Sequence, residues 1–450
     1  MAAHRSSVAP SAGAPRSEEA ELAILGAGPI GLEAALAAAE AGIPFVLLER
    51  GERVASHVRD WRHVPLFTPW DLDVSPRQRA ALAAAAAEPP AGSDCPTGGE
   101  LIAQVLEPLS RLPSVAPHLR LGTRVVAIGR EGLVKPVEIG TPRRAAARFR
   151  LLLEDEHGER VLLARSVFDC TGSYELPGWI GDGGIPAPGE RALGARVVRR
   201  LPDLDVEAAL WSGRRILLVG AGHSAQTAAV ALAELARRAP RTHATGALIT
   251  WAVRRLRPAI APDPADPLPA RRRLHAAAQA LLEGADPAVA PRAGATAIGL
   301  TAEDGAIRAT LRRCHPSGSA RGPEEPEELV VDRVLALVGA SGDEGLYREL
   351  QVHACYATSG PMRLAAQLLA SSSSDCMAQP SAGADVLVTT EPGFFLLGSK
   401  SYGRHSAFLL RAGWQQVDDA ISLLRRGSAD APAEPRTVGP QPAATQANGV

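Results

Sequence analysis

The fold of the chain is decided near its start by the stretch Glu21-Leu-Ala-Ile-Leu-Gly26-Ala-Gly28-Pro-Ile-Gly31. A short apolar strand runs into a glycine-rich turn, and an alanine-rich helix, Leu32 to Ala41, follows directly. Gly26 permits a tight turn, Gly28 lets the backbone approach a pyrophosphate, and Gly31 lets the helix pack closely on the strand. The helix N-terminus behind the turn presents free N–H groups to phosphates, so the stretch predicts a dinucleotide site.

A second apolar run, Phe45 to Leu48, follows this helix, and Glu49 ends it. A carboxylate at that place can accept hydrogen bonds from a ribose diol. Strand, turn, helix and strand together form the βαβ unit of a parallel sheet. The alternative is a structural turn with a surface glutamate.

The same pattern returns in Arg215-Ile-Leu-Leu-Val219, Gly220-Ala-Gly222-His-Ser224-Ala225 and a helix from Gln226 to Arg237. Ala225 replaces the third glycine, and Ser224 places a hydroxyl at the helix start. A further apolar run, Ala247 to Val253, completes the unit. The repeat predicts a second Rossmann-like domain.

No acid ends this second pair of strands; Arg254 and Arg255 stand there instead. Two planar guanidiniums suit the oxygens of a 2′-phosphate, which a carboxylate would repel. The pair therefore indicates NADPH rather than NADH as the second dinucleotide. The alternative is a solvated strand end.

The simplest organisation is an α/β chain with two Rossmann-like dinucleotide-binding domains, the second inserted into a discontinuous first. We expect the first domain at 20–185 and 331–426 and the second at 186–330, with disordered tails at 1–19 and 427–450. Further strands are expected at 124–128, 149–153, 160–163, 166–170, 296–300, 306–311, 329–338 and 393–397. Further helices are expected at 99–112, 271–282 and 406–425.

Composition limits the function. The 450 residues are 46% hydrophobic and 22% charged, with a formal net charge of −1. This balance argues against nucleic acid as a partner. We find neither a signal peptide nor an apolar run that could span a membrane, and the five scattered cysteines show no C-x-x-C pair. We therefore expect a cytoplasmic protein without a metal site; the sequence leaves its oligomeric state open.

These motifs, in this order, resemble the flavin-containing monooxygenase group, which includes N-hydroxylases and Baeyer–Villiger enzymes, over about residues 20–425. Gly26 to Gly31 matches the FAD motif of the group, and Gly220 to Ala225 matches its NADPH motif. Phe168-Asp-Cys-Thr-Gly-Ser-Tyr174 with Pro177 resembles its A-T-G-x-x-x-x-P linker, and Pro65-Leu-Phe-Thr-Pro-Trp70 resembles its L-x-T-P loop beside the flavin. The resemblance implies FAD in the first domain and NADPH in the second.

Two features depart from the group. The chain lacks the F-x-G-x-x-x-H-x-x-x-W fingerprint of Baeyer–Villiger enzymes, and Gly398-Ser399-Lys400 replaces the usual terminal Gly-Asp turn of related flavoproteins. The detailed flavin contacts are therefore expected to differ.

Two segments supply candidate catalytic residues. In Gly398 to Ser406, the side chains of Lys400, Tyr402, Arg404 and His405 could stabilise the N1–C2=O of an anionic reduced flavin; the alternative is a plain helix-capping loop. His57, Arg59, Trp61, His63 and Trp70 follow the first βαβ unit and could shape the substrate side of the flavin. Packing is the alternative for this second group.

Three functions remain. The first is a monooxygenase that uses NADPH and O2 to oxidise a small molecule through a flavin C4a-(hydro)peroxide. The second is an NAD(P)H dehydrogenase that passes electrons from FAD to a quinone or a protein partner. The third is a non-catalytic flavin-binding protein. The Ser224 and linker motifs favour the first. A dithiol-based disulfide reductase is excluded, because no cysteine pair has the required spacing.

Overall fold

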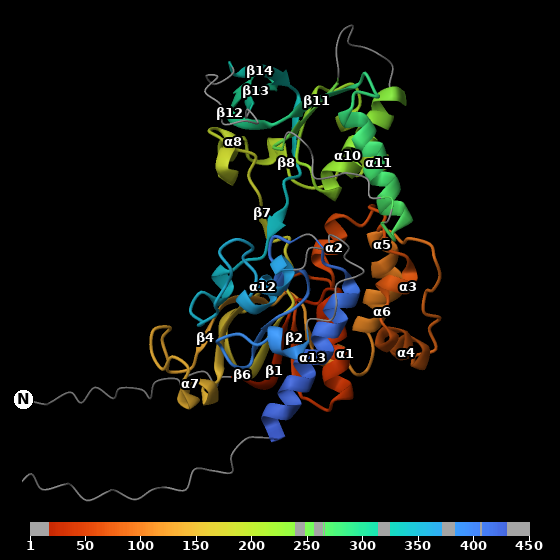
Figure 1. The fold of residues 1–450 in the computed structure, drawn as a ribbon. Helices are drawn as coiled ribbons and strands as arrows, with labels where there is room; N and C mark the ends of the chain where they lie inside the picture. Colours follow the sequence, from red (N-terminus) through yellow and green to blue (C-terminus); the bar gives the residue numbers. More distant parts are fainter. Residues whose placement is uncertain are drawn as a thin grey trace, which may run out of the picture.

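The computed structural model describes residues 18–238, 248–255, 264, 266–313, 325–370, 383–405 and 407–429. These residues form two α/β units, which lie one above the other in Figure 1. The helices are α1 (Pro29–Glu40), α2 (Ser56–Asp60), α3 (Trp70–Asp73), α4 (Pro76–Ala84), α5 (Gly98–Leu101), α6 (Glu107–Ser110), α7 (Pro142–Ala146), α8 (Glu190–Leu193), α9 (Leu204–Trp211), α10 (His223–Arg238), α11 (Pro269–Leu282), α12 (Met362–Ala370) and α13 (Leu410–Ala429).

The first unit is built on a mixed sheet in the order β3-β2-β1-β6-β5-β4, with β17 also paired to β6. Its strands are β1 (Glu18–Leu25), β2 (Phe45–Leu48), β3 (Leu119–Arg120), β4 (Arg124–Arg130), β5 (Phe149–Asp155), β6 (Gly158–Asp169) and β17 (Phe394–Leu396). β5 is antiparallel to both of its neighbours, β4 and β6, and the other pairings are parallel. Since β17 comes from the far end of the chain, the first unit is discontinuous.

Strand β1 shows why this sheet is buried on both faces. Side chains alternate along a strand, so Leu22 and Ile24 pack on one face, in the same core as residues of α1 and α13. Ala23 and Leu25 pack on the other face, with residues of β5 and the turn around Tyr347. Parallel strands covered on both faces typically have continuous apolar sequences, as residues 22–25 of β1 and the whole of β2 do.

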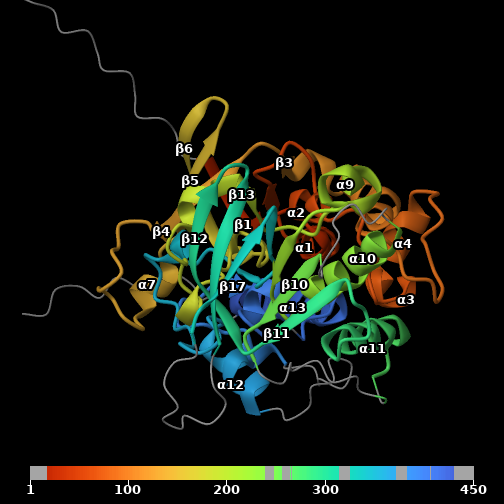
Figure 2. The ribbon, with the colours of Figure 1, turned by 90° about the horizontal axis from the view of Figure 1, so that it is seen from above.

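The second unit has a parallel sheet in the order β11-β10-β9-β15-β8 and an antiparallel sheet β12-β13-β14. Its strands are β8 (Val197–Val198), β9 (Ile216–Val219), β10 (Ile249–Val253), β11 (Val289–Ala293), β12 (Ala295–Glu303), β13 (Ala306–Arg313), β14 (Glu327–Val331) and β15 (Arg333–Ala336). Seen from above, β12 and β13 lie to one side of this unit and α10 and α11 to the other (Figure 2).

The chain passes between the units twice, and the two passages pair with each other. β7 (Leu176–Pro177) is antiparallel to β16 (Ala340–Ser341). β7 lies between the upper and lower units in Figure 1. The inserted arrangement expected from the sequence therefore has a two-stranded connection.

The structure corrects three expected boundaries. The single strand expected at 329–338 is split into β14 and β15, because Asp332 turns the chain by accepting from the Arg215 backbone N–H (2.7 Å). β15 pairs with β9, so the second unit extends beyond the expected end at 330. Strands expected at 160–163 and 166–170 are one strand, β6.

The helix expected at 99–112 contains a π-helical turn, Ile102–Leu106, between α5 and α6. Of the expected tails, residues 18 and 19 already belong to β1, and α13 continues to Ala429. Residues 1–17 and 430–450 lie outside the described residues. No described helix is both long and apolar enough to cross a membrane.

Candidate functional site

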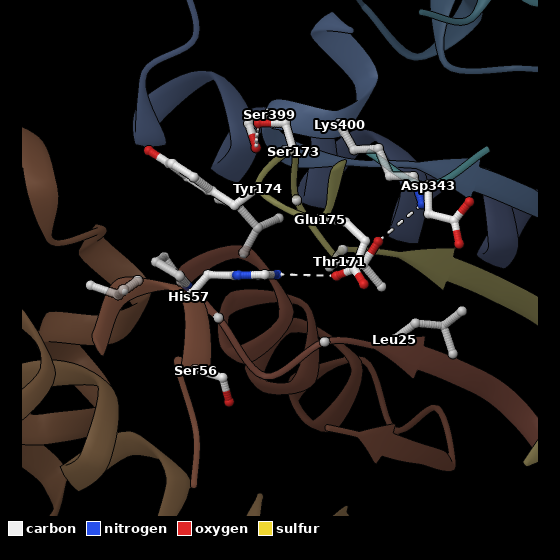
Figure 3. A pocket seen from close by; sticks show the side chains of 18 of the residues that line it. Leu25, Ser56, His57, Thr171, Ser173, Tyr174, Glu175, Asp343, Ser399 and Lys400 are labelled. Carbon is white, nitrogen blue, oxygen red and sulfur yellow. Dashed lines mark hydrogen bonds and ion pairs between the residues drawn. The ribbon is translucent and has the colours of Figure 1, made fainter. Parts of the chain in front are cut away.

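A cavity of about 560 Å³ opens where the parallel strands of the first sheet end. Leu25, Leu48, Cys170 and Leu397, at or just beyond the carboxyl ends of β1, β2, β6 and β17, all line it. Ligands of open α/β sheets bind at this edge. The linker after β6 also lines the cavity, and Figure 3 shows Thr171, Ser173 and Tyr174 above Leu25, the last residue of β1.

The three glycines of the first turn serve different purposes. Gly26 has φ +90°, in the left-handed region, and a Cβ on Gly31 would lie 1.8 Å from the Gly26 carbonyl oxygen. The fold itself therefore requires glycine at both positions. At Gly28, φ is −86° and a Cβ would meet nothing within 4 Å. Since the protein leaves this space empty inside a cavity wall, glycine at 28 fits a cradle for a ligand.

Glu49 is held rigidly at the edge of the same cavity. Its Oε2 accepts from the Ala27 backbone N–H (2.9 Å), and its Oε1 accepts from the Gly51 N–H (2.9 Å) and the Ser56 hydroxyl (3.0 Å). A carboxylate has about four acceptor positions, so one remains for a ligand hydroxyl.

The second turn repeats this division. Gly220 has φ +136°, and a Cβ there would lie 2.1 Å from the Leu337 carbonyl oxygen, whereas a Cβ on Gly222 would meet nothing within 4 Å. The fully buried Ala225 fills the helix position under the turn. Ser224, at the start of α10, lines the cavity of the first unit. The two turns are therefore close enough to share one site.

Arg254 and Arg255 follow β10 directly and are exposed. β10 is parallel to β9, so the two arginines lie at the same sheet edge as the Gly220 turn. They do not line the cavity. Arg254 and Arg255 are therefore placed to contact a ligand bound at the Gly220 turn, on a part of that ligand that lies outside the cavity.

Comparisons with known proteins bear on the fold. No family model and no curated protein matches the chain. Among solved structures, bacillithiol disulfide reductase Bdr (YpdA) from Bacillus cereus matches with a TM-score of 0.63 at 18% identity, over 91% of this chain and 100% of that one. DfoA from Erwinia amylovora, a cadaverine monooxygenase solved with FAD, matches with a TM-score of 0.58 at 14% identity, over 96% of this chain and 100% of its own. A flavin-containing monooxygenase from Stenotrophomonas maltophilia matches with a TM-score of 0.51 at 17% identity, over 91% and 99%.

The chain therefore shares its two-domain fold with these three solved structures. In this two-domain fold, the candidate residues of the C-terminal loop divide into two groups. Lys400 is buried, and its ammonium donates to Asp169 Oδ2 (2.6 Å) and Thr171 Oγ1 (3.0 Å). Asp169 therefore balances its charge, and the ion pair ties the end of β6 to the C-terminal loop. Lys400, Arg404 and His405 all line the cavity, but only Lys400 is held by this buried ion pair.

The other two candidates of this loop, Tyr402 and Gly398, both make contacts inside the protein. The ring of Tyr402 packs in a small core with Leu364 and Leu368 and does not line the cavity. Gly398 lines the cavity, but its N–H donates inward to Gln416 Oε1 (2.8 Å).

Of the five residues expected on the substrate side, His57 and Trp61 line the cavity. Arg59 donates to Glu107 instead (2.7 Å), His63 faces Asp203 of the second unit (4.0 Å), and Trp70 is buried in the core. These three therefore contribute to packing between elements and not to the cavity wall.

Sequence reasoning missed four polar groups of the site: Asp169, Glu175, Asp343 and Ser399. Asp343, Glu175 and Ser399 line the cavity, and Ser399 Oγ lies 3.3 Å from Ser173 Oγ. The available signal was Asp169 itself, a charge at the carboxyl end of a buried strand. The partners of these groups come from distant segments, so no local spacing marks them.

Cysteine and metal chemistry find little support in the described residues. Cys95, Cys170 and Cys355 are free, and Cys314 and Cys376 lie outside the described part. Cys170 lines the cavity, but burial raises the pKa of its thiol well above the usual range, which disfavours the reactive thiolate. Within the described ranges, no cluster of three His, Cys, Asp or Glu side chains could hold a metal ion.

Proposed function

We propose that the chain is a FAD-dependent, NADPH-consuming oxidoreductase. One observation carries this proposal: each unit has a glycine turn with an empty position, at Gly28 and at Gly222, and Ser224 of the second turn reaches the cavity of the first. A dinucleotide on each turn would bring the two redox rings into one cavity. FAD and NADPH would supply hydride and electron transfer, while the protein supplies binding and orientation.

The residues of the chain would divide the binding as follows. The N-terminus of α1 behind Gly28 would hold the FAD pyrophosphate, and Glu49 would accept from its ribose. The Gly222 turn would hold the NADPH pyrophosphate, with Ser224 at the meeting point and Arg254 and Arg255 at the 2′-phosphate. Arg404 and His405 would face the ring system from the C-terminal loop.

Within this class we favour a monooxygenase acting on a small molecule with O2. Two of the structurally similar proteins described above are monooxygenases. The third is a disulfide reductase, but the sequence offers no C-x-x-C pair and the cavity-lining Cys170 is a poor thiolate. A dehydrogenase that reduces a quinone or a partner is the runner-up.

Stopped-flow oxidation of the NADPH-reduced protein distinguishes a monooxygenase from a dehydrogenase. A monooxygenase should react with O2 through an absorption band distinct from both the reduced and the oxidised flavin, and should oxidise NADPH slowly without substrate. A dehydrogenase should instead reoxidise without an intermediate band and turn over rapidly with a quinone. Protein that purifies colourless and takes up no FAD would contradict the whole proposal.

A further inference from the structure

Two charged residues and a histidine meet at the cavity wall from three separate segments. Arg50 follows β2, His57 lies on α2, and Glu175 lies in the linker after β6. Glu175 Oε1 accepts from the Arg50 guanidinium (2.5 Å), and Glu175 Oε2 lies 3.6 Å from His57 Nε2. A second nitrogen of Arg50 lies 3.3 Å from the same His57 Nε2. Figure 3 shows the imidazole pointing across to Glu175.

The sheet order tells what this group spans. β2 and β6 are the two neighbours of β1, and the glycine turn leaves the carboxyl end of β1. A bond from the segment after β2 to the segment after β6 must therefore cross the end of β1. Arg50, Glu175 and Gly28 all line the same cavity. The ion pair thus connects the two walls between which the turn would hold its phosphates.

The side chains are partly exposed, with 42% of Arg50, 31% of Glu175 and 25% of His57 accessible to solvent. The ring of Tyr174 lies beside His57, with centroids 6.0 Å apart. An ion pair at this depth can open without unfolding a core, unlike the buried Lys400–Asp169 pair.

We propose that Arg50, His57 and Glu175 form an ionic clasp that closes over the bound dinucleotide and slows its release. The proposal rests on the proposed function, in which the first cavity takes FAD. Glu175 is the centre of the clasp, because one of its oxygens accepts from Arg50 and the other faces His57 Nε2.

A competing arrangement predicts the opposite change in the rate of FAD release. If Arg50 served the cofactor phosphates directly, Glu175 would only compete for the guanidinium. Glu175→Gln would then leave Arg50 free to bind phosphate, and FAD would leave more slowly. In the clasp, the same substitution removes the link between the walls, and FAD leaves faster.

The test measures FAD release from the yellow holoprotein by the rise in flavin fluorescence after dilution. We expect Glu175→Gln to release FAD about 3- to 10-fold faster, as a partly exposed, charge-assisted pair is lost. Glu154→Gln is the matched control: Glu154 pairs with Arg124, which also lines the cavity, but Glu154 itself does not line it. Release from this control should equal that of the wild type.

Two further measurements distinguish loss of the clasp from a general loss of stability in the variants. Arg50→Gln combined with Glu175→Gln should be no faster than the faster single variant, since both remove one link. In the wild type, added salt should speed release more than it does in Glu175→Gln, because salt screens an exposed pair. Slower or unchanged release from Glu175→Gln would overturn the clasp. A wild-type protein that holds no FAD would instead overturn the proposed function.

Discussion

At Gly28 the protein leaves a Cβ-sized space that its own packing does not use, whereas Gly26 and Gly31 are glycines for the sake of the fold. The same contrast separates Gly222 from Gly220. A glycine whose absent side chain leaves open space, with an ordinary φ, is informative about a ligand. A glycine in the left-handed region is informative about the backbone.

We expect Gly28→Val to fold but to purify without FAD. The added methyl groups would occupy the space assigned to the pyrophosphate, and the loss of one charge-assisted hydrogen bond alone weakens binding about 10- to 150-fold. Flavin absorbance per protein and the melting temperature measure the two effects. Gly129→Val is the control, since a Cβ there also meets nothing within 4 Å but lies on β4, away from the turn. Stoichiometric FAD in Gly28→Val would show that the motif is only a turn.

Replacing Arg254 and Arg255 together by Ala should raise KM for NADPH about 10- to 150-fold and change KM for NADH little. The expected loss is one guanidinium–phosphate contact of about 1.5–3 kcal/mol. Steady-state kinetics with both coenzymes measure it. Arg237 and Arg238, at the far end of α10, provide a control pair for the same double substitution. Equal effects on the two coenzymes would make Arg254 and Arg255 structural.

At the scale of elements, a buried ion-pair triad joins segments that are far apart in the sequence. Glu391 is fully buried and accepts from Arg130 (2.7 Å) and Arg144 (2.9 Å). The triad fixes α7 and the end of β4 against the approach to β17. A buried carboxylate needs partners of this kind, because removal of one would leave an uncompensated charge in the interior.

Another buried carboxyl group belongs to Asp73, the last residue of α3. Its Oδ1 accepts from Thr68 (2.6 Å), its Oδ2 has no partner among the described residues, and burial raises its pKa to about 7. In the unfolded chain the ordinary value is 3.8. Between these two values the folded protein keeps a proton that the unfolded chain loses, so stability falls as the pH rises.

We expect Asp73→Asn to remove this dependence while keeping an acceptor for Thr68. The unfolding free energy of the wild type relative to the variant should fall by up to about 1.4 kcal/mol per pH unit between about pH 4 and 7. Urea unfolding at pH 5 and pH 8 measures the difference. Asp71→Asn, at an exposed carboxylate on the same helix, is the matched control substitution. If the difference in unfolding free energy between the wild type and Asp73→Asn were the same at both pH values, Asp73 would not be the group responsible.

The sequence predicts those parts of the site that depend on neighbours in the chain. Gly28, Glu49 and Ser224 belong to one strand–turn–helix pattern each, and their geometry follows from that pattern. Lys400 and Asp169 are 231 positions apart, and Arg50 and Glu175 are 125 apart. Such contacts depend on which strands become neighbours in the sheet. The split between β14 and β15 was missed for a similar reason, since it depends on the contact of Asp332 with Arg215.

At the scale of the whole molecule, contacts between the units set the position of the second glycine turn. Phe67 of the first unit packs on His223 at the start of α10, with ring centroids 4.9 Å apart. His223 stacks in turn on His275 of α11 at 5.3 Å. Burial lowers the pKa of His223 to about 4, with His275 and Arg271 adding to the effect, so this contact is uncharged at neutral pH.

Phe67→Ala should slow flavin reduction by NADPH about 5- to 50-fold and leave flavin content unchanged. The contact holds the second turn against the cavity, and small misplacement of reacting groups costs much of the rate. Anaerobic stopped-flow loss of flavin absorbance measures the reduction step. Phe67→Leu should restore most of the rate, because it restores apolar contact. An unchanged rate in Phe67→Ala would show that other contacts position the turn.

The pairing of β7 with β16 has one more consequence. Pro177 and Ala340 are direct neighbours across that ribbon, so everything between them leaves and re-enters the first unit at a single point. Deleting 178–339 would bring together two ends that already lie side by side, and the flavin-side sheet would keep all its strands. If the inserted unit binds NADPH as proposed, the coenzyme preference of the protein should be exchangeable by replacing residues 178–339 in one piece.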